Sequence, residues 1–217
     1  QAGGPSLLLT DLSAEMILPP EGFNFRVSCS SNLWEEAVLR GRLDAKVFRG
    51  ESHLDLKGFQ PGLLMDFLLP SSEYRVSDSL LDLGVLFKVE GLEGVQAELQ
   101  GAFPGMTIVR AGNEATLKSG RFNATANMGA EGITLSLKDL SLEEPKLAAS
   151  GEVVLGAGEG GIRVRLEGRD VDIPSARETT LSLAGDDPDV AKLFDVLRAG
   201  VVPGVVFQSA AGTVSGL

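Results

Sequence analysis

Residues 81–89 read LDLGVLFKV, with an apolar side chain at every second position from Leu81 to Val89. Successive side chains of a β-strand point to opposite faces, so this run predicts a strand with one apolar face. The same period recurs at residues 23–27, 43–47, 95–99, 122–128, 133–137 and 162–166. Turn signals such as Glu90-Gly91 and Lys118-Ser119-Gly120 separate these runs at the spacing of hairpins rather than of βαβ units. The pattern therefore predicts a mainly β, antiparallel protein.

Two regions depart from this period and predict short helices. Apolar residues at helical spacing within residues 61–69 precede Pro70, which predicts a helix of about two turns. In residues 175–199, Ser175 and Glu178 fit a capping box that would begin a helix ended by Gly185. Asp187 followed by Pro188 fits the start of a second helix, so this region predicts a helical pair.

An internal repeat organises the chain. Gly41 and Gly151 are separated by the same 110 positions as Gly58 and Gly168, and a predicted helix follows each copy. The phrase TDLS at residues 10–13 recurs upstream of the second copy as KDLS at residues 138–141. We read residues 1–70 as a first strand unit ending in a short helix. Residues 71–217 form a second unit with the helical pair and the start of a further strand unit, or both form one continuous domain.

Composition argues against several classes of function. The net charge of −11 and the lack of a basic cluster disfavour nucleic-acid binding and electrostatic docking on anionic lipid. One cysteine, Cys29, rules out an intrachain disulfide, and with one histidine, His53, it falls short of a zinc site. We predict no metal and no cofactor. Cys29 shares the phase of Phe23 and Phe25, which predicts a buried structural thiol.

Each remaining motif has a structural explanation. The glycine-rich run at residues 156–161 matches GxGxxG, but a strand follows it where a dinucleotide site needs a helix, so we predict a hairpin turn. Acidic residues near Asp187 and Glu143 lack the ligand spacing of a calcium loop. The sequon at Asn123 fits a solvent-facing strand residue. No activated nucleophile or carboxylate pair stands out, so the chain is not expected to be an enzyme.

The order of these elements resembles the AsmA-like superfamily of Gram-negative envelope proteins, which includes AsmA and TamB. Three stretches carry the resemblance: residues 41–61, residues 135–153, and residues 184–200, where a helix ending in Arg-x-Gly leads back into a strand. The resemblance implies a curved, folded-over antiparallel sheet, a "β-taco", whose apolar inner face holds acyl chains. It also implies a periplasmic section of a protein anchored in the inner membrane outside these residues.

On this reading the protein shields lipid tails and supports phospholipid transport and outer-membrane biogenesis, with phospholipid or another acyl lipid and envelope proteins as its partners. Candidates for the lining of the groove are Leu83, Val85, Phe87, Leu135, Leu137, Val164 and Leu166. The alternative is a structural or protein-interaction β module of the envelope that binds no lipid. Periodicity does not distinguish an open groove from a closed core, because both need the same alternation.

Overall fold

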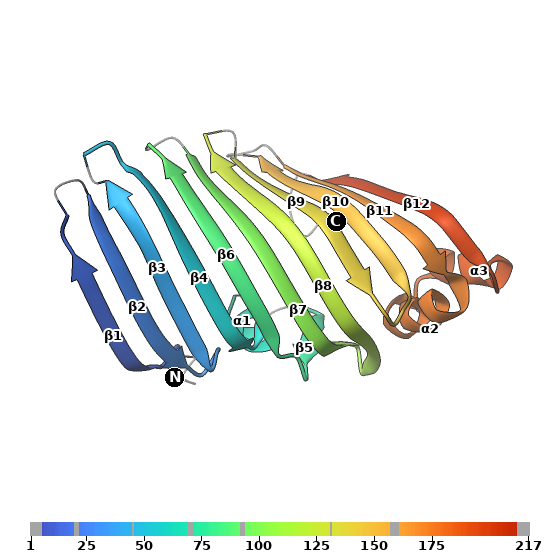
Figure 1. Cartoon of the computed structure of the whole chain (residues 1–217). Helices are drawn as coiled ribbons and strands as arrows, with labels where there is room; N and C mark the ends of the chain where they lie inside the picture. The colour runs from blue at the N-terminus through green and yellow to red at the C-terminus, as the bar shows by residue number, and fades with distance from the viewer. Residues whose placement is uncertain are drawn as a thin grey trace.

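The computed structural model describes residues 6–19, 22–44, 46–68, 72–91, 94–130, 132–156 and 161–211, which form one β-sheet and three short helices (Figure 1). The elements in chain order are β1 (Leu9–Ile17), β2 (Phe23–Ser31), β3 (Glu36–Asp44), β4 (Arg49–Phe59), α1 (Pro61–Leu68), β5 (Tyr74–Ser77), β6 (Leu81–Glu90), β7 (Gly94–Arg110), β8 (Asn113–Gly129), β9 (Gly132–Leu142), β10 (Leu147–Gly156), β11 (Ile162–Asp172), α2 (Ile173–Ala184), α3 (Pro188–Val196) and β12 (Val201–Ala211). The predicted mainly β class, the antiparallel sheet and both helical regions are confirmed.

All twelve strands belong to one antiparallel sheet that is curved and not closed. Its order is β1-β2-β3-β4-β6-β7-β8-β9-β10-β11-β12, so sequence neighbours are mostly spatial neighbours. The exception is β5, which pairs with residues 107–110 at the end of β7. β6 pairs with the earlier residues 95–102 of the same strand. The unit boundary predicted at residue 70 falls between β4 and β6, which are hydrogen-bonded neighbours. β1 and β12 form the two edges of the sheet (Figure 1).

Hairpins connect most of the strands, as the turn signals predict. The glycine-rich run at residues 156–161 joins two antiparallel neighbours, β10 and β11, although residues 157–160 lie outside the described part of the chain. One predicted strand, at residues 43–47, is too long: β3 ends at Asp44, residues 46–48 form a turn, and Ala45 lies outside the described residues. The Lys46 N–H donates to Asp44 Oδ1 at 2.9 Å, which stabilises the turn directly after β3, and Phe48 has a positive φ of 53° just before β4.

The repeated phrase TDLS/KDLS marks two β-bulges. In β1 the register shifts between Thr10 and Ser13, where Asp11 has a φ of 52°. In β9 the three steps from Leu137 to Leu140 span only two steps of β8, from Ala124 to Phe122. An extra residue in one strand shifts the phase of all residues beyond it. The bulge in β9 therefore returns Leu140 to the same face as Leu137, although their spacing breaks the alternation.

Gly41 and Gly151, one equivalent pair of the predicted repeat, have the same local role. Gly41 in β3 and Gly151 in β10 each precede a second strand and then a helix. A Cβ added at Gly41 would lie 2.6 Å from the Glu51 carbonyl oxygen, and one added at Gly151 would be too close to the Arg165 carbonyl oxygen. Both positions therefore need glycine because the neighbouring strand approaches closely.

The helices pack at the ends of the strands rather than over the sheet. α1 contacts β5, and α2 contacts β7, β8, β11 and α3 (Figure 1). α2 begins one residue after Asp172, whose side chain accepts a hydrogen bond from the Ser175 backbone N–H. The predicted capping box at Ser175 was therefore wrong, because Asp172 already caps the helix from outside. The N-cap at Asp187 is confirmed: its side chain accepts from the N–H groups of Asp189 and Val190.

Arg110 fixes the helical pair to the sheet. Its Nη1 donates to the Leu183 carbonyl oxygen at 2.7 Å and to Asp186 Oδ1 at 2.8 Å. The guanidinium carbon also lies 5.5 Å from the ring centroid of Tyr74 in β5. One half-buried cation thus joins the end of β7 to β5 and to the corner between α2 and α3.

A small hydrophobic cluster lies near the strand ends where the helices pack. Leu81, Phe103 and Leu142 form its centre, and partly buried residues pack around them: Phe59, Met106, Leu117, Phe122, Leu140 and Leu147. Phe103 lies directly opposite Gly120, where an added Cβ would fall inside its ring. Among the described residues no large side chain is fully buried, which is expected of a sheet without a second layer.

We expect Gly120→Ala to lower the free energy of unfolding by about 1–3 kcal/mol, because the new methyl group displaces the Phe103 ring. Urea denaturation followed by circular dichroism measures the change. Gly105→Ala in β7 is the matched control, since its nearest neighbour would lie 3.8 Å from the new Cβ. An equal loss of stability in both variants would show that the ring contact is not the cause.

Candidate functional site

All seven predicted lining residues project to the same face of the sheet. Residues directly opposite each other in antiparallel neighbours share a face, so the register can be followed from strand to strand. Val85, Leu137 and Leu166 lie in one cross-strand row: Ala14, Val27, Leu39, Leu54, Val85, Leu99, Ala124, Leu137, Gly151, Leu166 and Phe207. No side chain in this row is polar.

Two flanking rows on the same face hold the other four residues. Phe87, Leu135 and Val164 lie in the second row: Met16, Phe25, Gly41, Ser52, Phe87, Ala97, Ala126, Leu135, Val153, Val164 and Ser209. Leu83 lies in the third: Cys29, Ala37, Leu56, Leu83, Gly101, Phe122, Leu140, Ala149, Gly168 and Val205. We call these three rows together the apolar face.

No other element covers the apolar face within the described part of the chain. Leu135 and Leu166 keep 40% and 39% of their surface exposed, and Phe87 and Leu137 are half-buried. Val85 is buried at 5% exposure, and its cross-strand neighbours Leu54 and Leu99 are apolar. The face is therefore a broad apolar surface open to solvent, and surfaces of this kind usually mark a binding site.

Sequence reasoning missed several residues of this face. Leu39, Leu54 and Phe207 belong to the first row but were not among the seven candidates. Leu39 and Leu54 had a signal in the alternation of β3 and β4, and Phe207 lies in the apolar run of β12. The place of all three in the row follows only from the strand pairing. Cys29 takes its expected place on the apolar face, opposite Ala37. Its thiol is free and half-buried.

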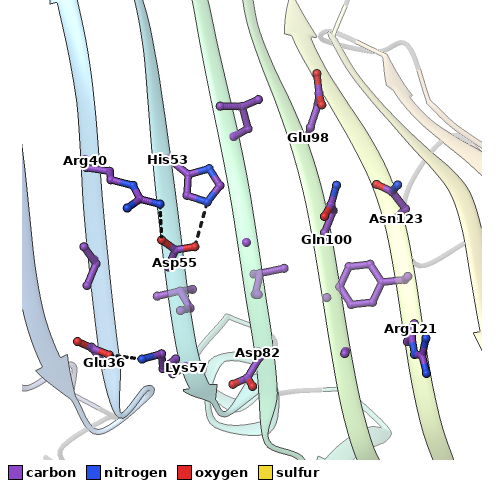
Figure 2. Close-up of a pocket in the computed structure, with 18 of the residues that line it drawn as sticks. Glu36, Arg40, His53, Asp55, Lys57, Asp82, Glu98, Gln100, Arg121 and Asn123 are labelled. Carbon is purple, nitrogen blue, oxygen red and sulfur yellow. Dashed lines mark hydrogen bonds and ion pairs between the residues drawn. The ribbon is translucent and has the colours of Figure 1, made fainter.

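The opposite face is polar and carries cross-strand ion pairs. A hollow of about 960 Å³ lies on this side and extends over strands from β2 to β9. Figure 2 shows its lining from β3 to β8. Asp55 Oδ1 lies 2.9 Å from His53 Nε2, and its Oδ2 lies 3.4 Å from Arg40 Nη2. Lys57 Nζ donates to Glu36 Oε2 at 2.8 Å, which raises the pKa of Lys57 above its ordinary value. Of the seven candidates, Leu83 alone also borders this hollow.

The polar hollow combines both signs of charge without a recognisable reactive group. Its border includes the cations Arg26, Arg40, Lys57 and Arg121 and the anions Glu36, Asp55, Asp82, Glu98 and Asp139. Within the described residues no group of three or more His, Cys, Asp or Glu side chains could hold a metal ion. His53 sits on a strand and hydrogen-bonds a carboxylate two residues away. These pairs neutralise one another and keep this face hydrated.

Comparisons with known proteins add no relative: no family model, no curated protein sequence and no solved structure matches this chain. Among the helices of the described residues, none has the length and apolar character needed to cross a bilayer. The apolar face therefore stands on its own geometry as the candidate functional site.

We expect Leu135→Ser combined with Leu166→Ser to reduce the fluorescence of a bound hydrophobic dye such as anilinonaphthalene sulfonate. Both side chains are partly exposed on the apolar face, so the dye loses contact area while the unfolding free energy falls by only about 1 kcal/mol per site. Val154→Ser is the control, because Val154 faces the polar side, opposite Thr134 and Arg163. Equal dye signals in the native protein and the double variant would contradict binding at this face.

Proposed function

We propose that the apolar face shields the acyl chains of a lipid, and that the protein is a periplasmic section of an AsmA-like envelope protein that supports phospholipid transport and outer-membrane biogenesis. The observation that carries the proposal is the alignment of three apolar rows, two from β1 and one from β2, that run to β12 without a covering layer among the described residues. A soluble protein that leaves so broad an apolar surface open needs an occupant for it.

The chemistry of the face suits a lipid tail. Its side chains are almost all aliphatic or aromatic, with Ser52 and Ser209 the polar members of the second row. Each methylene group removed from water on this surface contributes about 0.8 kcal/mol. The rows repeat the same surface from strand to strand, so a tail that moves across them keeps a similar buried area. Movement along the face would therefore meet low barriers and need no catalytic residue.

The charge distribution supports the same assignment. Glu15, Arg26, Arg40 and His53 form one row of the opposite face, which continues through Glu98 and Glu152 to Gln208. Ionised side chains would repel an acyl chain because they lose hydration beside it. The register places them on the other side of the sheet from every candidate lining residue. The two faces are thus separated into one suited to tails and one suited to water.

A structural or protein-interaction module remains the second candidate, and the open edge strands favour it. Val206 and Phe207 in β12 are 57% and 53% exposed, and Met16 and Ile17 in β1 are 63% and 68% exposed. Unpaired strand edges bind partner strands by main-chain hydrogen bonds. This function would need the edges and not the apolar face. Substitutions in the edge strands would therefore impair partner binding, whereas substitutions on the apolar face would impair lipid binding.

We expect a fluorescently tagged phospholipid to bind the purified protein, and Leu135→Glu to weaken this binding about tenfold or more. A carboxylate in the second row removes contact with at least two methylene groups, about 1.6 kcal/mol, and about 1.4 kcal/mol corresponds to tenfold in affinity. Titration by fluorescence anisotropy measures the affinity, and native mass spectrometry identifies the bound lipid.

Thr134→Glu provides the matched control for this experiment. Thr134 precedes Leu135 in β9 but lies opposite Asn127 and Val154 on the polar side. Its variant adds the same charge to the same strand and should bind lipid like the native protein. If the native protein binds no phospholipid, or if both variants lose binding equally, the lipid proposal is wrong and the interaction module becomes the better assignment.

A further inference from the structure

The floor of the polar hollow contains a glycine that the backbone does not require. Gly84 in β6 lies directly between Asp55 in β4 and Gln100 in β7. A Cβ added at Gly84 would meet only the Gln100 carbonyl oxygen, at 4.0 Å, and Gly84 is not among the glycines with a positive φ. Neither a close approach of a neighbouring strand nor a left-handed conformation therefore explains this glycine. Its missing side chain leaves room in the middle of the hollow.

The β3–β4 side of the hollow matches its own charges. Asp55 forms ion pairs with both Arg40 and His53, and Lys57 donates a hydrogen bond to Glu36. Figure 2 shows these pairs together on one side of β6. Their charges are thus largely compensated within the protein, so this side forms a wall of the hollow rather than a set of unoccupied binding groups.

The β7–β8 side is different, because its polar side chains have no partner within the described part of the chain. Gln100 and Asn123 lie directly opposite each other, and Arg121 is the next residue of β8 on the same face (Figure 2). All three are exposed, and none of their side chains makes a hydrogen bond or ion pair with another described residue. Each amide offers donors and an acceptor, and the guanidinium offers further donors. This side therefore presents a row of unoccupied hydrogen-bonding groups beside an open floor.

The charges around the hollow favour a neutral ligand. Four cationic and five anionic side chains border it, so neither sign dominates. A phosphate-rich ligand would meet the carboxylates, and a polyamine would meet the arginines. A hydroxyl group is both donor and acceptor, as a side-chain amide is, so the hydroxyl groups of a sugar suit Gln100 and Asn123. Val38 and Leu86, which also border the hollow, provide contacts for the C–H faces of sugar rings.

The shape of the hollow suits a chain of sugars rather than a single ring. It extends over β2-β3-β4-β6-β7-β8-β9, which makes six strand spacings. At roughly 4.8 Å between strands, its length is about 29 Å. A peptide ligand would pair with a strand edge or insert side chains into apolar pockets. The hollow offers neither, because β6 at its centre is hydrogen-bonded to strands on both sides.

We propose that the polar hollow binds a neutral, linear oligosaccharide, with the side chains of Gln100 and Asn123 hydrogen-bonding to its hydroxyl groups beside Gly84. The binding is non-covalent and needs no reactive group. The site lies on the opposite face of the sheet from the surface proposed for lipid. It therefore holds or fails independently of lipid binding, and the two faces can be occupied at the same time.

Isothermal titration calorimetry tests the site with three neutral linear hexasaccharides: maltohexaose, cellohexaose and chitohexaose. We expect the native chain to bind at least one of them. Gln100→Ala combined with Asn123→Ala should weaken this binding about tenfold or more, because the sugar loses its hydrogen bonds to both amides. Gly84→Val should also weaken it by filling the floor of the hollow, and the sheet is retained because valine is favoured in strands. Circular dichroism checks that each variant is folded.

Gln96→Ala combined with Asn127→Ala is the matched control. These two amides also lie directly opposite each other in β7 and β8 on the polar side, but they do not border the hollow. This variant should bind the oligosaccharide like the native chain, and so should Leu135→Glu on the apolar face. A hexamer of galacturonic acid tests the preference for a neutral chain. It should bind more weakly than the neutral chain, because its carboxylates meet those of the hollow.

Three results would overturn the proposal. The native chain would bind none of the neutral hexasaccharides at millimolar concentration, or the acidic hexamer would bind more tightly than they do, or the two paired amide variants would bind equally well. The last result would show that Gln100 and Asn123 do not form the site. Whether the native chain binds phospholipid changes none of these readings.

Discussion

The structure depends on one constraint: the antiparallel register must keep the apolar residues of every strand on the same face. Side chains alternate with period two, so a slip of one residue in any pair would move an entire strand to the wrong side. At Asp11 and near Lys138 the apolar residues are not spaced two apart. A bulge at each place absorbs the extra residue and keeps the apolar side chains on one face. Leu140 returns to the apolar face only because one extra residue is absorbed in β9.

A single layer follows from this arrangement, with consequences for stability and function. The helices lie at the strand ends, so the sheet has one small cluster around Leu81 and Phe103 but no core that runs its full length. Most of the apolar face is buried only by its own neighbours. Such a surface is costly to leave in water, which is why an occupant, whether an acyl chain or another molecule, is central to any account of this protein.

Local signals in the sequence predicted the elements well where side-chain pattern alone decides them. The alternation in residues 81–89 and 162–166 gave β6 and β11, and the Asp187-Pro188 pair gave the start of α3. The start of α2 was misplaced because Asp172 and Ser175 are both suitable cap residues. α2 begins directly after β11 ends at Asp172, so Asp172 is the cap. The alternation at residues 43–47 failed because the chain turns after Asp44, whose side chain accepts a hydrogen bond from the Lys46 N–H.

The sequence by itself determined the class of the fold, the phase of the strands whose alternation is unbroken and the apolar character of the seven candidate residues, because alternation is a property of neighbouring residues. It did not determine which strands are neighbours, since pairing joins residues far apart in the chain. Only the tertiary structure decided that Val85, Leu137 and Leu166 share one row, and that a charged row lies behind them. It also decided that β1 and β12 lie at the two edges of the described sheet, which no local pattern in their sequences reveals.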